Sequence, residues 1–178
     1  MTTRIALLRG INVGRNKRIA MADLRAMLES LGYDDVRTHL QSGNAIFEAG
    51  AGKDATLEIQ ISAGIKAAFG MEVAVMVRTA VEIAAVVDSN PFVARGVDTN
   101  ELHATFVAAE PPAAKIDAVD RAACAPDEFA VGDRVIYLRL HNGVMGSRLP
   151  DWDKALGIRT TTRNWNTTTR LRELTASR

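Results

Sequence analysis

The sequence predicts an α+β protein made of two ferredoxin-like units with antiparallel sheets, each sheet with helices on one face. Residues 5–77 show strand-like and helix-like patterns in the order β-α-β-β-α-β, which is the order of that fold. A β-α-β-β-α pattern recurs in the second half of the chain, and a helix with a polar stretch separates the two. We therefore expect an N-terminal ferredoxin-like domain over residues 1–79, a bridging helix and linker over 80–97, and a C-terminal α+β domain over 98–178.

The first unit opens with residues 5–8, an almost continuous apolar run that is typical of a central strand. Later strands alternate apolar and polar residues, and the helices carry apolar residues at three- and four-residue spacing. These patterns predict a helix over 21–31 closed by Gly32, a hairpin of strands 36–41 and 45–48 turning at 42–44, a helix over 57–68 closed by Gly70, and a strand over 73–77.

The second unit follows a helix that begins at a capping box, Thr79 with Glu82, and stops at Asn90-Pro91. Residues 94–101 resemble a linker, because they contain Gly, Asp and Asn. The patterns beyond it predict a strand over 102–108, a helix from Pro112 with a stripe reaching 123, a hairpin of strands 129–131 and 135–140 turning at 132–133, a short helix over 151–156, and a last helix over 163–174.

The sequence predicts a cytoplasmic protein and argues against a disulfide-bonded, secreted or membrane-spanning one. With one cysteine, Cys124, no disulfide can form within the chain, and no apolar run approaches the roughly 20 residues of a membrane span. The N-terminus has no signal-peptide pattern. We expect no membrane association and no cofactor.

Metal and nucleophile chemistry find little support in the sequence. The three histidines, His39, His103 and His141, have no partner at a metal-ligand spacing, so we expect no metal site. Gly146-Ser147 lacks the context of a nucleophile elbow. Residues 50–53 read Gly-Ala-Gly-Lys, but they lack the first glycine and the hydroxyl residue of a phosphate loop, which favours a flexible connection.

The loop that follows the first strand is the strongest candidate for a binding site. Glycines 10 and 14 let a backbone approach an anion closely, and four cations with no acid surround them. A solvated connection is the alternative interpretation of the same residues. The candidate ligand-binding residues of this loop are Arg9, Asn12, Arg15, Lys17 and Arg18.

The C-terminal segment is also basic. Residues 1–18 and 159–178 hold five cations each and only one acid between them, whereas the rest of the chain has 12 cations and 20 acids. If the two ends meet, they form one positive face. The run 160–170 combines threonines, arginines and Trp165, which suits phosphate contact and base stacking but also an amphipathic helix whose tryptophan lies in the core. Its candidate ligand-binding residues are Arg163, Asn164 and Arg170.

Several motifs together resemble the domain of unknown function 1697 family. They are residues 7–14 (LLRGINVG), 21–24 (MADL), 36–38 with 40–44 (VRT, LQSGN), 90–92 (NPF) and 162–167 (TRNWNT). The resemblance spans almost the whole chain and implies two ferredoxin-like α+β domains in a bacterial cytoplasmic protein, with no established reaction. Arg15 stands where the family commonly has a second glycine, and His39 where it usually has tyrosine.

Three functional hypotheses follow. The leading one is a protein that binds an anionic partner, nucleic acid or nucleotide, through the basic residues named above. The second is an enzyme acting on a small phosphorylated or carboxylated substrate, with Gln41, Ser42 and Asn44 as polar groups of its site. The third is a structural or interaction module in which the motifs only maintain the fold.

Overall fold

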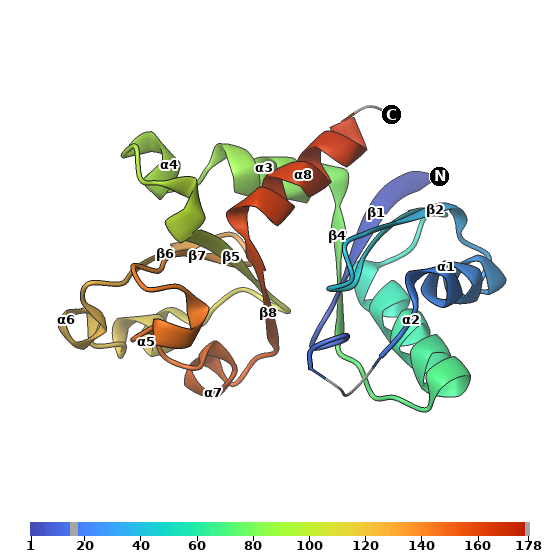
Figure 1. The fold of residues 1–178 in the computed structure, drawn as a ribbon, viewed down its shortest axis with the longest axis horizontal. Coiled ribbons are helices and arrows are strands. Elements are labelled where there is room, and N and C mark those ends of the chain that lie inside the picture. Colours follow the sequence, from blue (N-terminus) through green and yellow to red (C-terminus); the bar gives the residue numbers. More distant parts are fainter. Residues whose placement is uncertain (15–17, 177–178) are drawn as a thin grey trace. The chain divides into compact units, whose positions relative to one another are not determined.

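The computed structural model describes residues 1–14 and 18–176, and the chain divides into two compact units. The first comprises Met1–Glu82 and Thr175–Arg178, and the second Ile83–Leu174. Each unit contains one four-stranded antiparallel sheet flanked by helices, which confirms the predicted α+β fold of two ferredoxin-like units (Figure 1). The domain bounds predicted from the sequence stay a prediction.

The first sheet has the strand order β2-β3-β1-β4, with β1 in the interior between two antiparallel neighbours. On one face, Ala6 and Leu8 of β1 pack in a buried cluster with apolar side chains of both helices, among them Leu24 and Ile61. The elements are β1 (Thr2–Leu8), α1 (Met21–Ser30), β2 (Asp34–His39), β3 (Asn44–Ala49), α2 (Asp54–Phe69) and β4 (Val75–Thr79). The central position predicted for the first strand is confirmed, and β4 begins two residues later than predicted because its ladder with β1 starts at the pair Leu8–Val75.

The second sheet repeats this topology with the order β6-β7-β5-β8. Its strands are β5 (Leu102–Val107), β6 (Glu128–Gly132), β7 (Val135–Arg139) and β8 (Thr160–Asn164). The helices of this half are α3 (Ala80–Asp88), α4 (Pro91–Ala94), α5 (Ala113–Asp117), α6 (Arg121–Cys124), α7 (Trp152–Leu156) and α8 (Trp165–Ala176), with 3-10 turns η1 (Thr99–Glu101) and η2 (Val144–Gly146).

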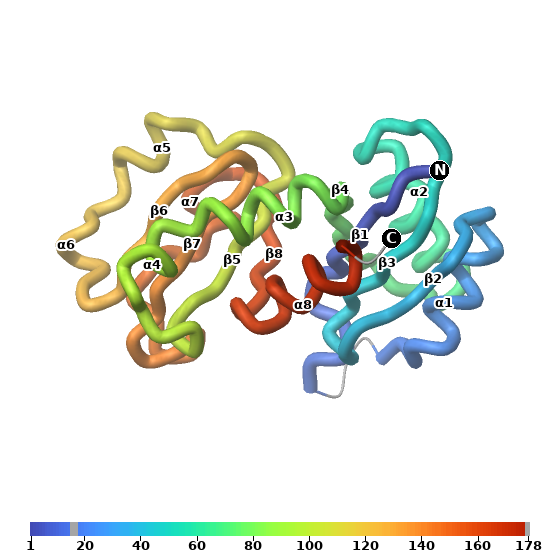
Figure 2. Tube along the Cα trace, turned by 90° about the horizontal axis from the view of Figure 1, so that it is seen from above, coloured from blue at the N-terminus to red at the C-terminus, as the bar shows by residue number. Residues whose placement is uncertain are grey.

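Helices cover both faces of the second sheet, whereas the sequence predicts helices on one face only. On one face Val107 packs with Ile116 of α5 and Leu156 of α7. Ala104 and Phe106 point to the opposite face and are also fully buried. Figures 1 and 2 both show α3 and α4 passing over this second face. Because β5 is buried along its whole length, neither of its faces is exposed to solvent.

The last strand is the main element that the sequence prediction missed. The predicted helix over 163–174 begins at Trp165 instead, because residues 160–164 pair with β5 as β8. Three consecutive threonines favour a strand, since β-branched side chains fit a pleated sheet better than a helix. The Asn164 side chain accepts a hydrogen bond from the Thr167 N–H (2.8 Å) and so caps α8. Trp165 is buried, which supports its interpretation as a core residue.

Two local predictions in the second unit are also wrong. The helix predicted from Pro112 to residue 123 is two short helices, α5 and α6, because Asp120 caps a new helix by accepting from the Ala122 and Ala123 N–H groups. The β6–β7 turn lies at Asp133-Arg134, one residue later than predicted, with Arg134 at a φ of 51°. The capping box at α3 is confirmed: the Thr79 hydroxyl accepts from the Glu82 N–H, and the Glu82 carboxylate accepts from the Thr79 N–H.

Candidate anion-binding site

Three connections meet at one end of the first sheet. Strand β1 ends at Leu8, β3 begins opposite it at Asn44, and β4 begins at Val75. Backbone hydrogen bonds join the connections directly: the Leu8 N–H donates to the Gly43 carbonyl (2.8 Å) and the Arg9 N–H donates to the Ala74 carbonyl (2.9 Å). The cationic loop after β1 therefore leaves the sheet from a fixed starting point.

Asn12 fixes the shape of this loop from within. Its side-chain Nδ2 donates to the carbonyls of Ile19 (2.9 Å) and Gln41 (2.7 Å), and its Oδ1 accepts from the Ile19 N–H (2.8 Å). These bonds use both amide hydrogens, so they tie the two ends of the loop together and attach it to the β2–β3 turn. Asn12, predicted as a ligand-binding residue, has a positioning role in this geometry.

Close packing beneath the loop reinforces the same arrangement. Ile11 is 1% exposed and lies against Gly43, where an added Cβ would come within 2.7 Å of the Ile11 Cδ1 and 2.8 Å of the Leu8 Cβ. Gly43 also has a φ of +79°. Only a glycine meets both conditions without displacing its neighbours. The buried Asn44 closes the turn by donating to the His39 carbonyl (2.9 Å) and the Ser42 hydroxyl (3.1 Å).

The backbone of residues 10–14 alternates in the sign of φ. Gly10, Asn12 and Gly14 have φ values of 66°, 55° and 64°, while Ile11 and Val13 are not in the positive-φ region. Where left-handed residues alternate with right-handed helical ones, successive N–H groups turn toward a common point and form an anion-binding concavity called a nest. Among the described residues, no acceptor takes a backbone hydrogen bond from the N–H groups of residues 10–14.

Exposed polar and charged side chains surround this backbone. Arg9 and Arg18 are exposed at the two ends of the loop, and the Arg18 Nη2 lies 3.4 Å from the Gly14 carbonyl. Gln41 and Ser42 are exposed on the adjoining turn. The other two predicted cations of the loop, Arg15 and Lys17, lie outside the described residues. The described geometry therefore brings N–H donors, two guanidinium groups and two neutral polar side chains to one end of the sheet.

The three C-terminal candidates make contacts within the second unit. Arg163 is buried, it donates to the Thr161 hydroxyl (2.9 Å) and the Thr162 carbonyl (3.0 Å), and burial lowers its pKa to about 10. Asn164 caps α8, and Arg170 forms an exposed ion pair with Glu173 (2.7 Å). We therefore do not include them in the candidate site, and the convergence of the two basic ends stays a prediction.

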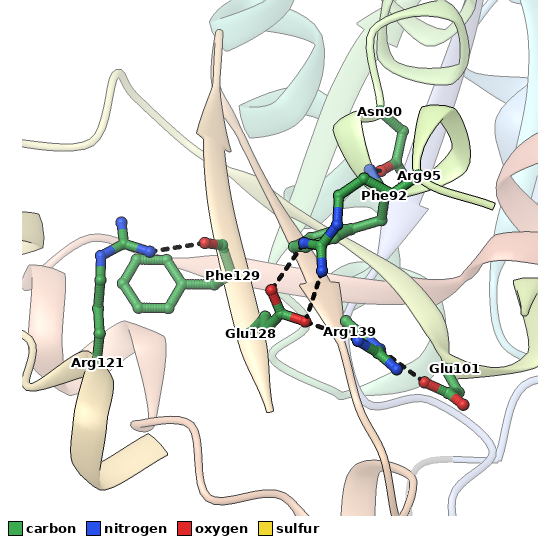
Figure 3. Close-up of polar contacts among 8 residues, drawn as sticks. All are labelled: Asn90, Phe92, Arg95, Glu101, Arg121, Glu128, Phe129 and Arg139. Carbon is green, nitrogen blue, oxygen red and sulfur yellow. Dashed lines mark hydrogen bonds and ion pairs between the residues drawn. The ribbon is translucent and has the colours of Figure 1, made fainter. Parts of the chain in front are cut away.

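A charge cluster in the second unit was not found by the sequence analysis (Figure 3). Arg139 bridges Glu101 and Glu128 at 2.8 Å each, and Arg95 makes a bidentate pair with Glu128 at 2.7 and 3.2 Å. The hydrogen bond from Arg95 is the main cause of the lowered pKa of Glu128. Two carboxylates balance two guanidinium groups, so the cluster fastens α4 and η1 to the sheet. The partners are 11 to 38 residues apart, a separation that no local pattern reveals.

Phe92 and Phe129 belong to the same region and explain the Asn90-Pro91-Phe92 motif. The Asn90 side chain accepts from the Phe92 N–H (2.9 Å) and caps α4, while Phe92 is buried. The guanidinium carbon of Arg121 lies 3.9 Å from the centre of the Phe129 ring, and Arg121 also donates to the Phe129 carbonyl. The motif and the ring contact thus stabilise the fold of this unit.

Other chemistry is sparse in the described part of the chain. No three metal-ligating side chains gather there, and none of its helices has the length and apolar character to cross a membrane. Burial lowers the pKa of His103, which favours a neutral imidazole. Cys124 is buried, and burial is the main cause of its raised pKa, so its thiol stays protonated at neutral pH.

Comparisons with known proteins agree with the fold. The family model described as "Protein of unknown function (DUF1697)" matches residues 1–137. A conserved bacterial protein, SP0830 from Streptococcus pneumoniae, superposes with a TM-score of 0.75 at 20% sequence identity, covering 99% of each chain. At this identity the likeness concerns the fold alone. No curated protein matches the sequence.

Proposed function

The chain belongs to the DUF1697 family of proteins of unknown function, and we propose that it binds the phosphate group of a small anionic ligand at residues 9–14 and 18 of its N-terminal unit. The observation that carries this proposal is the alternating sign of φ over residues 10–14, a pattern shared with backbone nests whose N–H groups bind anions. Arg9 and Arg18 supply positive charge at either end of the loop. Charge-assisted hydrogen bonds of this type contribute about 1.5–3 kcal/mol each.

The supporting geometry is preorganised. Asn12, Gly43 and the two backbone bonds from Leu8 and Arg9 position residues 8–12 against the sheet before any ligand arrives. A rigid set of donors loses little conformational entropy on binding, which raises affinity for a small anion.

A small ligand fits this arrangement better than a long nucleic acid strand. Nucleic acid binding needs several cations spread along a surface. The C-terminal candidates Arg163, Asn164 and Arg170, which would extend such a surface, are instead engaged in contacts within the second unit. The support is therefore confined to a single loop, which favours a ligand with one phosphate or a pyrophosphate group.

Isothermal titration calorimetry with inorganic pyrophosphate tests the proposal. The double variant Arg9→Gln with Arg18→Gln should bind at least tenfold more weakly than the wild type. Lys53→Gln is a control, because Lys53 is exposed and lies at the start of α2, beyond the opposite end of β3. An absence of wild-type binding, or equal affinities of the double variant and the wild type, contradicts the proposal.

A salt series separates the two ligand classes. A small anion should show a shallow dependence of the binding constant on salt, whereas an oligonucleotide that displaces many counterions shows a steep one. If a 12-nucleotide single strand binds more tightly than pyrophosphate, and its binding constant falls steeply with salt, nucleic acid becomes the favoured ligand.

A further inference from the structure

Two exposed apolar side chains flank the candidate anion site. Val13 is 71% exposed within the loop after β1, and Leu40 is 54% exposed at the end of β2. The hydrogen bond from the Asn12 side chain to the Gln41 carbonyl (2.7 Å) joins their immediate neighbours in the chain. Of the other exposed large apolar residues described in this unit, Met1 precedes β1, Leu31 directly follows α1, and Ile59 and Val81 lie on helices.

Leucine is poorly suited to the conformation that residue 40 adopts. Leu40 has a φ of 60°, in the left-handed region that glycine and asparagine tolerate best and that strains bulky residues. Residues held in such conformations cluster at ligand-binding sites, where their side chains are needed.

Packing within the protein does not account for Leu40 either. Leu40 is 54% exposed, so its partial burial offsets only part of the backbone strain. Asparagine would relieve the strain at this position without loss of a core contact. A leucine here is explained if its side chain contacts something outside the protein.

We infer that the ligand of this site is a nucleotide, whose phosphate lies on the loop backbone and whose base packs against Leu40 and Val13. This inference rests on the proposed function and adds the class of the organic group. Gln41 and Ser42, which follow Leu40 in the chain, are exposed polar residues of the same turn. A sugar phosphate offers no comparable apolar surface to the two side chains.

The test compares ligands that share a phosphate but differ in the organic group: pyrophosphate, a hexose phosphate, and the purine and pyrimidine nucleoside diphosphates. For the wild type, at least one nucleotide should bind about tenfold more tightly than pyrophosphate, the factor expected from covering one aliphatic side chain. Leu40→Asn should remove this advantage and leave pyrophosphate affinity within twofold. Leu31→Asn, the same change at the end of α1, is the control and should alter neither affinity.

The thermal stability of the Leu40→Asn variant distinguishes a ligand-binding role of Leu40 from a structural one. Its thermal midpoint should equal or exceed that of the wild type, because asparagine tolerates positive φ better than leucine. A lower midpoint would show that Leu40 serves the fold, which overturns the inference. Equal affinities for pyrophosphate, hexose phosphate and nucleotides overturn it while leaving the proposed function standing, whereas a wild type that binds none of them removes both.

Discussion

Replacement of Gly43 by alanine tests the arrangement on which the candidate site depends. Gly43 has a φ of +79°, and a Cβ at this position would lie 2.7 Å from the Ile11 Cδ1 and 2.8 Å from the Leu8 Cβ. Real Cβ atoms essentially never approach other heavy atoms below 3.0 Å, so Ile11 and β1 would have to move. Both neighbours are buried, 1% and 0% exposed, and have little room to do so.

Two energies add at this position. A non-glycine residue in the left-handed region costs about 1–2 kcal/mol, and forcing additional volume into a packed region costs about 1–3 kcal/mol. The Gly43→Ala variant should therefore lose about 2–5 kcal/mol of unfolding free energy. The displaced Ile11 should also distort residues 10–14, so pyrophosphate affinity should fall with it.

Gly10→Ala provides a matched control. Gly10 has a φ of +66°, close to that of Gly43, but a Cβ there would meet nothing within 4 Å. Its cost should be the backbone part alone, about 1–2 kcal/mol. Urea denaturation of the three proteins measures the difference. Equal losses for Gly43→Ala and Gly10→Ala would refute the packing argument and with it the claim that the β2–β3 turn holds the loop.

Three further predictions concern other contacts. Thr79→Ala should cost about 1 kcal/mol in a urea titration, because it removes the hydroxyl that caps α3. Hydrogen bonding from Arg95 depresses the pKa of Glu128, so the ion pair should make the wild type more stable than Glu128→Gln above about pH 4.3, the usual pKa of an unfolded glutamate. This difference should vanish as the pH falls through the lower pKa of the folded state. Because both side chains are partly exposed, we expect a difference of about 1 kcal/mol, which thermal midpoints measured from pH 7 to pH 2 would show. Asp127→Asn should cost about 2 kcal/mol and speed tryptic cleavage at Arg148, because the buried carboxylate accepts from two backbone N–H groups that fix the loop 141–148.

Elements with a local cause were predicted correctly from the sequence. The first strand was placed in the sheet interior because residues 5–8 have no polar face, and the α3 capping box is visible as Thr79 with Glu82. Likewise, Gly70 ends α2 in the left-handed conformation, as the pattern of a helix followed by glycine indicates. In each case the side chains that decide the structure are close together in the chain.

Elements decided by distant partners were not predicted. Residues 160–164 form a strand because β5 offers a free edge more than 50 residues earlier in the chain, and a hydroxyl pair of Thr105 and Thr162 at 2.8 Å joins the two. Without knowledge of the pairing with β5, the residue pattern that begins at Arg163 predicts a helix. For the same reason Arg163 was assigned to a surface, although its position opposite Ala104 in the ladder buries it.

Part of the candidate site could be inferred from composition and part could not. Glycines 10 and 14 with Arg9 and Arg18 were recognisable as an anion-binding pattern, but the role of Asn12 was not. Asparagine is a plausible phosphate ligand in sequence, and only the fold shows its amide between Ile19 and Gln41. The turn at residues 42–44 was predicted from the sequence, whereas the contact of Gly43 with Ile11 depends on the tertiary structure.

Comparison of the two units supports the proposal of a binding site in the first of them. Both have the same strand order, and in both a carboxylate from the helix before the last strand accepts a backbone N–H of that strand: Glu58 from Val77 (2.9 Å) and Asp153 from Thr160 (2.9 Å). The fold and this supporting contact are thus repeated. The connection after the first strand differs between the two units. In the first unit, residues 9–20 are cationic and contain two glycines in the left-handed region. In the second unit, residues 108–112 are Ala-Ala-Glu-Pro-Pro, with an acid and two prolines that lack an N–H donor. If the glycines and cations served only to make this connection, the second unit would show that the fold needs neither. Their presence in one unit and absence from the other is therefore better explained by binding than by folding.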